Sequence, residues 1–310
     1  MNEETMRQSP SGKRTVKKFF TDVLHGCCIG VAFIIPGFSG GSVAAILGIY
    51  ETLVNAIANI FKDFKKNLLT LLPIFFGMII GIVSLLFPIG WALENFPLPT
   101  VSLFVGLALG GLPSITDKLG KKKIKAQNFA AFLIPLLAAA TISFLPTGSA
   151  VDLFDLNFGG YVLLFIIGII GSSALVVPGI SGSMLLLIFG YYDPIVTLIT
   201  DHFFKGKDVG VSFSVLGCTA LGIAVGFIAI SKIMSILLKK CPRGTYFAIL
   251  GFIIGSVPTI YISTAKDAGY ALGALPTAPI YWIMCAVMLA IGVAISLALI
   301  IFSKKIANNK

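Results

Sequence analysis

The chain has 310 residues, of which 57% are hydrophobic and only 12% are charged, and its mean hydropathy is +0.99. Soluble domains carry about 45–50% apolar and about 25% charged residues, so this composition excludes a soluble globular protein. Apolar stretches of the length that spans a bilayer recur along the chain, for example at 68–91 and 281–302. Alternating strands with polar lumen positions, the signature of an outer-membrane barrel, are absent from the sequence. We therefore predict an all-α integral membrane protein.

The formal net charge is +10, but the basic residues form short clusters between apolar segments instead of a basic domain. Such clusters are typical of cytoplasmic loops, so we expect no nucleic-acid partner. The five cysteines lack the paired spacing of a disulfide framework or a metal site, and we expect neither a metal nor a cofactor. An oligomeric state cannot be read from the sequence, because lipid-facing and partner-facing apolar surfaces have the same composition.

A short motif occurs twice. Residues 35–41 read IPGFSGG and lead to GIYE at 48–51, while residues 177–183 read VPGISGS and lead to GYYD at 190–193, at a constant offset of 142 residues. Internal repeats are common in transporters, so we predict two related halves. Further glycines correspond at an offset of 145 residues: Gly77 and Gly81 with Gly222 and Gly226, and Gly106 and Gly110 with Gly251 and Gly255.

Each half contains five apolar segments, at about 19–35, 41–60, 68–91, 99–115 and 128–146, and at about 160–177, 183–200, 211–238, 245–262 and 278–303. The first two segments of each half are joined only by the Pro-Gly-x-Ser-Gly turn, which is too short to connect two complete crossings. We therefore predict two re-entrant or broken helical hairpins and about six full crossings. The expected organisation is a cytoplasmic tail (1–18), a first membrane repeat (19–146), an external linker (147–159), a second repeat (160–303) and a cytoplasmic tail (304–310).

The distribution of lysine and arginine predicts the orientation. Assigning the tails and the basic clusters at 62–66, 118–125 and 239–243 to the cytoplasm places 19 of the 23 basic residues inside. Both termini are then cytoplasmic, the first hairpin opens to the cytoplasm and the second opens to the exterior. Inverted repeats with broken helices are typical of alternating-access transporters, which bind substrate near the bilayer midplane.

The two turns are candidates for anion binding. Pro36 and Pro178 should end the helices before them, because proline disfavours helical geometry in the preceding residue and lacks an amide donor. The open amides and partial positive charge at the start of the next helix suit a phosphate group. Close helix packing is the alternative explanation of the glycines. The candidate phosphate-binding residues are Gly37, Ser39, Gly40, Gly41, Ser42, Gly179, Ser181, Gly182, Ser183 and Arg243.

Three ionisable residues are candidates for coupling or gating. Glu51 and Asp193 occupy equivalent positions after the two motifs, and His25 precedes the first motif. Charged groups in or near a membrane are costly unless they function or pair. Because both motifs contain G-x-S-G, an intramembrane serine hydrolase that uses Ser39 and His25 is an alternative function. A carrier of small soluble anions is a further alternative.

The motifs at 35–42 and 178–183, the segments at 48–51 and 190–193, and the stretch from Gly251 to Pro258 closely resemble the polyprenyl-phosphate (undecaprenyl-phosphate) transporter family of bacteria and archaea. This family was formerly known only as a membrane domain of unknown function. The resemblance extends over nearly the whole chain, and it implies a translocase in the cytoplasmic membrane of a prokaryote rather than an enzyme. By this resemblance, the protein returns the lipid carrier phosphate from the outer to the inner leaflet for reuse in cell-wall synthesis.

Overall fold

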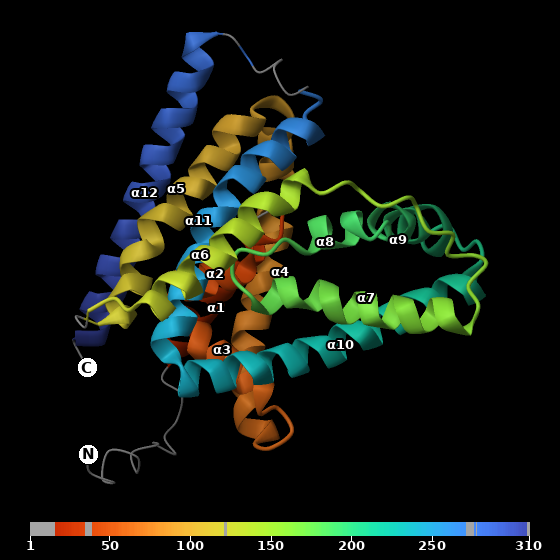
Figure 1. The fold of residues 1–310 in the computed structure, drawn as a ribbon, viewed down its shortest axis with the longest axis horizontal. Coiled ribbons are helices and arrows are strands. Elements are labelled where there is room, and N and C mark those ends of the chain that lie inside the picture. The colour runs from red at the N-terminus through yellow and green to blue at the C-terminus, as the bar shows by residue number, and fades with distance from the viewer. Residues whose placement is uncertain (1–15, 35–38, 121–122, 271–275, 277, 309–310) are drawn as a thin grey trace.

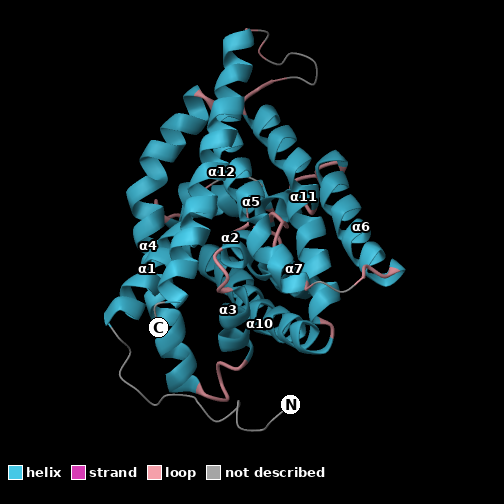
Figure 2. Ribbon diagram, turned by 90° about the vertical axis from the view of Figure 1, so that its left-hand side faces the viewer, coloured by secondary structure: helices cyan, strands magenta, loops and turns pink. Residues whose placement is uncertain are grey.

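The computed structural model describes residues 16–34, 39–120, 123–270, 276 and 278–308. Within these ranges the chain forms helices and no strand (Figure 2), which confirms the predicted all-α membrane class. The α-helices are α1 (Val16–Ala32), α2 (Gly40–Ile46), α3 (Tyr50–Ala58), α4 (Phe64–Asn95), α5 (Pro97–Thr116), α6 (Ala126–Thr141), α7 (Phe158–Val176), α8 (Gly182–Ile188), α9 (Tyr192–Thr197), α10 (Val209–Lys240), α11 (Pro242–Asp267) and α12 (Pro279–Asn308). Short 3₁₀ turns follow α5 and α6, and a π turn (Leu198–Phe203) follows α9.

Six helices in the described part of the chain are long and apolar enough to cross a membrane: α4, α5 with its 3₁₀ turn, α7, α10, α11 and α12. Six crossings were predicted, but one of the six is a different helix. The structure has α7, predicted as a hairpin arm, among the long helices, whereas α6, predicted as a full crossing, is shorter. The segment that becomes α6 has only 16 residues, whereas α7 has 19. The pair formed by α8 and Tyr192–Phe203 is bent by 110° and is either a broken span or a re-entrant loop.

The helices form two groups (Figure 1). In the first group, α12, α5, α11 and α6 lie side by side in this order. In the second group, α1 packs along α4, α7 packs along α10, and α3 bridges α4 and α10. The short helix α2 contacts α1, α5 and α7 between the two groups. Figure 1 shows α7, α9 and much of α10 projecting away from the first group.

Glycines allow the long helices to approach backbone to backbone. A Cβ atom added at Gly77 of α4 would lie 2.0 Å from the carbonyl oxygen of Val23 in α1, far inside van der Waals contact. The corresponding Gly222 of α10 faces Phe165 of α7 in the same way, at 2.3 Å. Small residues at helix crossings are the usual means of close packing in membranes. For these glycines, the packing explanation is therefore the correct one.

Each segment that follows a motif is two helices rather than one. The predicted segment 41–60 breaks between α2 and α3 at Gly48 (φ +73°), and the segment 183–200 breaks between α8 and α9 at Gly190 (φ +75°). Glycine adopts positive φ without the steric cost that other residues incur. The break places Tyr50 and Glu51 at the start of a new helix, and it places Tyr192 and Asp193 there as well.

Candidate functional site: a polar cavity at the two Ser-Gly turns

The first turn lies against the end of α7. The buried Ser39 hydroxyl donates to the carbonyl oxygens of Ala174 (3.0 Å) and Val177 (3.4 Å). A Cβ atom on Gly41 would lie 3.0 Å from the Val176 oxygen, so the start of α2 approaches the same backbone closely. The two motifs, 142 residues apart in sequence, are thus neighbours in space. Pro36 and Gly37 lie outside the described residues.

The second turn has a different local geometry. Helix α7 ends at Val176, and Gly179 follows Pro178 with φ +84°. A Cβ atom on Gly179 would lie 2.5 Å from the Phe252 oxygen of α11, so glycine is required here by both conformation and space. Ser181 then caps α8, because its hydroxyl accepts a bond from the Met184 amide at 3.4 Å. Ser39 makes no such cap on α2, since its hydroxyl donates to α7 instead.

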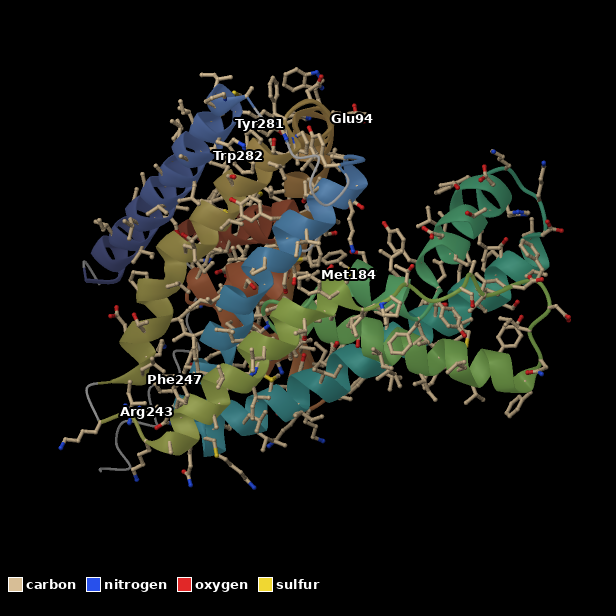
Figure 3. All side chains as sticks on the ribbon, turned by 45° about the horizontal axis from the view of Figure 1, so that its top comes forward. Glu94, Met184, Arg243, Phe247, Tyr281 and Trp282 are labelled. Atoms are coloured by element: carbon tan, nitrogen blue, oxygen red, sulfur yellow. The ribbon has the colours of Figure 1, made fainter. Side chains whose placement is uncertain are left out.

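A cavity of about 510 Å³ lies where the two turns meet. Its polar lining comes from Ser39 in the first turn, Ser181 and Ser183 in the second, and Tyr192, Ser263 and Asp267. The hydroxyls of Ser181 and Ser183 are 3.1 Å apart. This volume lies within the range of small-molecule sites, about 300–1,000 Å³. Figure 3 labels Met184, another lining residue, at a height between Arg243 and Glu94.

Three candidates of the first turn, Gly40, Gly41 and Ser42, do not line the polar cavity. Gly40 and Gly41 line a second, apolar cavity, and Ser42 is buried in α2 with 3% of its surface exposed. Gly182 lines the polar cavity, whereas Gly179 shapes the turn through its contact with α11. The structure therefore brings Ser39, Ser181, Gly182 and Ser183 together.

The sequence analysis missed Asp267 as a cavity residue. The predicted segment ends near residue 262 and leaves Asp267 between two segments, but α11 continues to Asp267 and carries the carboxyl group to the cavity wall. Ser263 lies one turn earlier on the same helix and also lines the cavity. A carboxylate beside a bound anion is unfavourable unless a proton or a cation is shared between them.

Arg243 lies away from this cavity. It is at the first turn of α11, 20 residues before Ser263, which corresponds to about 30 Å along a helix that rises 1.5 Å per residue. Its Nη1 atom donates to the Lys123 carbonyl oxygen at 3.0 Å, and its guanidinium lies 5.9 Å from the centre of the Phe247 ring. Figure 3 shows Arg243 and Phe247 together at the end of the molecule opposite Glu94.

The first turn of α3 contacts the end of α7, α11 and the turn after α5. The buried Tyr50 hydroxyl donates to the Val176 carbonyl oxygen at 2.9 Å. The Glu51 carboxylate accepts a hydrogen bond from the Tyr246 hydroxyl and lies 3.5 Å from the Lys118 ammonium. Glu51 thus connects α3 to α11 and to the turn after α5.

Asp193, the counterpart of Glu51, makes no comparable bridge to any residue that the structure describes. It is exposed and lines a small cavity of about 90 Å³ with Thr147 and Gly148 of the linker. The end of α8 joins the same linker, because the Gly148 amide donates to the Leu187 oxygen at 3.1 Å. The two acidic residues therefore lie beside different loops, Glu51 beside Lys118 and Asp193 beside the linker.

The Ser39–His25 pair of the hydrolase alternative is not assembled. Both hydrogen bonds of the Ser39 hydroxyl go to backbone carbonyls of α7 and the second turn. The buried Nδ1 atom of His25 makes no hydrogen bond within the described part of the chain. A serine nucleophile requires a base within hydrogen-bond reach, so this geometry does not support catalysis.

A helical membrane protein with several apolar spans and a polar cavity between broken helices has the architecture of a membrane transporter. The chain matches the model of the VCA0040-like family, described as undecaprenyl phosphate translocase-like, over residues 29–271. It belongs to this family, which confirms the predicted family and the transporter class.

Two relatives named as polyprenyl-phosphate transporters are similar to the chain. A polyprenyl-phosphate transporter of Staphylococcus aureus is 29% identical over 282 residues, covering 90% of this chain and 95% of that protein. A polyprenyl-phosphate transporter of Vibrio cholerae is 30% identical over 140 residues, covering 41% of this chain and 44% of that protein. The match thus spans less than half of the Vibrio protein and nearly all of the Staphylococcus protein. No solved structure matches the chain.

Proposed function

We propose that this protein translocates undecaprenyl phosphate or a related polyprenyl phosphate across the cytoplasmic membrane of a prokaryote, from the outer to the inner leaflet. The phosphate binds in the polar cavity, which is lined by Ser39 of the first turn and by Ser181 and Ser183 of the second, whose hydroxyls are its donors. The main support is that Ser39 and Ser181, equivalent residues of two distant motifs, line one cavity. Both relatives named above are polyprenyl-phosphate transporters.

Helix pairing supports an inverted repeat as the basis of transport. The pair α1–α4 in the first half corresponds to α7–α10 in the second, and α5–α12 corresponds to α11–α6. Arg243 binds the backbone of the basic loop at Lys123, so two clusters assigned to the cytoplasm lie on one side. Glu51 faces that side through Lys118, whereas Asp193 faces the external linker, as inversion requires.

The conformation corresponds to an outward-facing state. The polar cavity lies at the Asp267 end of α11, far from the cytoplasmic Arg243 end. Tyr50 and Glu51 close the route toward the cytoplasm through their bonds to Val176 and Tyr246. After the gate opens, Arg243 would receive the phosphate at the inner face, since arginine binds phosphate well. Glu51, Asp193 and His25 act in this scheme as gating or coupling residues.

Asp267 supplies a reason for proton linkage. A lipid phosphate in the cavity would share the space with its carboxyl group, and two negative groups at short range cannot both stay ionised cheaply. A proton held between phosphate and carboxylate removes this repulsion. In our proposal, substrate entry therefore takes up a proton, which is released when the phosphate leaves.

The proposal is tested by leaflet exchange in proteoliposomes that contain undecaprenyl phosphate. Ser181→Ala combined with Ser183→Ala removes two hydroxyl donors, and because a hydrogen bond to a charged group contributes about 1.5–3 kcal/mol, exchange should fall by about tenfold or more. The matched control is Ser173→Ala, whose hydroxyl bonds the Ile170 oxygen outside the cavity. Unchanged exchange in the double variant would refute the site. Uptake of inorganic phosphate without lipid exchange would instead identify a soluble-anion carrier.

A further inference from the structure

A second cavity, of about 410 Å³, lies on the other side of α2 from the polar cavity. Helices α1, α2, α3 and α4 supply most of its lining, and α7 and α10 complete it. The only polar side chain among these lining residues is that of Tyr50, whose hydroxyl is already bonded to the Val176 oxygen. Apolar cavities of this kind do not hold water well, so the natural occupant is hydrocarbon.

The two cavities adjoin. Phe33 and Leu175 line both of them, and the start of α2 separates them, with Ser39 facing the polar cavity and Gly40 facing the apolar one. One molecule that occupies both must therefore be polar at one end and apolar at the other. A phosphate-headed lipid has this chemistry, whereas a soluble anion does not.

The apolar cavity is also reachable from the bilayer. Its wall on α4 includes Leu72 and Phe75, whose surfaces are 48% and 59% exposed, and α4 is long and apolar enough to span, so we infer that these side chains contact lipid. The wall begins at Leu68, just after the basic cluster at 62–66, so the cavity lies toward the cytoplasmic end of α4. A headgroup in the outer half of the protein would have its chain pointing this way.

We propose that the apolar cavity binds the isoprenoid chain segment next to the phosphate while the headgroup occupies the polar cavity. This inference rests on the proposed function and adds a chain site to it. Because the chain comes from lipid and not from water, its burial gives little affinity. The cavity therefore acts mainly by shape, providing a path that a rigid side chain can block.

The experiment uses farnesyl phosphate with a photoreactive diazirine on its last isoprene unit and full-length protein in proteoliposomes. Labelling of peptides from α2, α3 and the first half of α4 is expected. Ala44→Phe, which places a ring in the cavity, should lower this labelling by about tenfold, because a well-packed site does not accept both ring and chain. Leu72→Trp narrows the mouth without repacking the core and should lower it as well.

Leu69→Trp is the matched control, since Leu69 is 49% exposed on the same helix and lines neither cavity. Equal labelling in all variants, or an equal loss with Leu69→Trp, would overturn the chain site even if undecaprenyl phosphate exchange persists. Undecaprenyl phosphate should compete better than undecaprenol. Equal competition by undecaprenol would support the chain site but contradict phosphate recognition, and so separates the two proposals.

Discussion

Gly77→Ala is expected to lower the thermal stability of the protein sharply. The added Cβ atom would lie 2.0 Å from the Val23 carbonyl oxygen, and the contacting atoms belong to the α1 backbone rather than to a flexible side chain. Separating the helices to relieve this contact also disturbs Gly26, which faces Ile74 in the same crossing. Overpacking typically costs about 1–3 kcal/mol and occasionally more, and a backbone contact belongs at the upper end.

The matched control is Gly90→Ala in the same helix. An added Cβ atom at Gly90 has nothing within 4 Å, so the substitution gains helix propensity, about 1 kcal/mol, without a clash. Melting of the detergent-solubilised variants, followed by loss of the monodisperse peak in gel filtration, should shift in opposite directions. Equal melting temperatures of the two variants would contradict this prediction, because they would mean that α1 and α4 can move apart at little cost in free energy.

Much of the fold was predictable because its signals are local or periodic. Apolar length marked the long helices, and the repeated Pro-Gly-x-Ser-Gly turns marked the places where helices end. The glycines at matching positions, such as Gly77 and Gly222, indicated equivalent crossings, and these glycines do pack α1 on α4 and α7 on α10. The breaks at Gly48 and Gly190 were missed, because an isolated glycine within an apolar run is also compatible with a continuous helix.

The site was predictable only where the motif itself supplies the residues. Ser39, Ser181 and Ser183 line the cavity, but the partners of Ser39 are backbone carbonyls at the end of α7, which no sequence pattern marks. Asp267 was missed because its position depends on α11 extending past its apolar stretch. Arg243 was placed with the turns on chemical grounds, although helix length alone separates it from Ser263 by about 30 Å.

Under the proposed inverted repeat, exchanging the packing of the two halves gives a model of the inward-facing state. The counterpart of Tyr50 in the second half is Tyr192, and the counterpart of Val176 in the first half is Ile34, both at the offset of 142 residues. The bond from Tyr50 to the Val176 oxygen therefore corresponds to a bond from Tyr192 to the Ile34 oxygen. Tyr192 and Ile34 both line the polar cavity, so in the proposed exchange they meet when this cavity closes. In the present conformation, Tyr50 is buried while Tyr192 is only partly buried.

We call Tyr50 with Glu51 the cytoplasmic gate and Tyr192 the external gate. Substitutions at these two gates should shift the conformational equilibrium in opposite directions. Tyr50→Phe with Glu51→Gln removes the Val176 bond and weakens the Tyr246 bond, which in the proposed orientation hold the cytoplasmic side closed. The Glu51 side chain is 46% exposed, so we take the lower end of the range for such bonds, about 2 kcal/mol in total, which is about a 30-fold shift toward the inward-facing state. Tyr192→Phe removes the bond expected in that state and should favour the outward-facing state.

The measurement is the labelling rate of a cysteine at Ser183 by a membrane-impermeant thiol reagent added from outside, in a background whose five native cysteines are replaced by alanine. Tyr50→Phe with Glu51→Gln should slow this labelling, and Tyr192→Phe should speed it. Tyr161→Phe is the control, because its hydroxyl bonds Ser214 between α7 and α10 and joins no gate. In the proposed exchange, the Tyr50 hydroxyl stabilises the outward-facing state and the Tyr192 hydroxyl stabilises the inward-facing state. If both variants changed the labelling rate in the same direction, the exchange of packing would be contradicted.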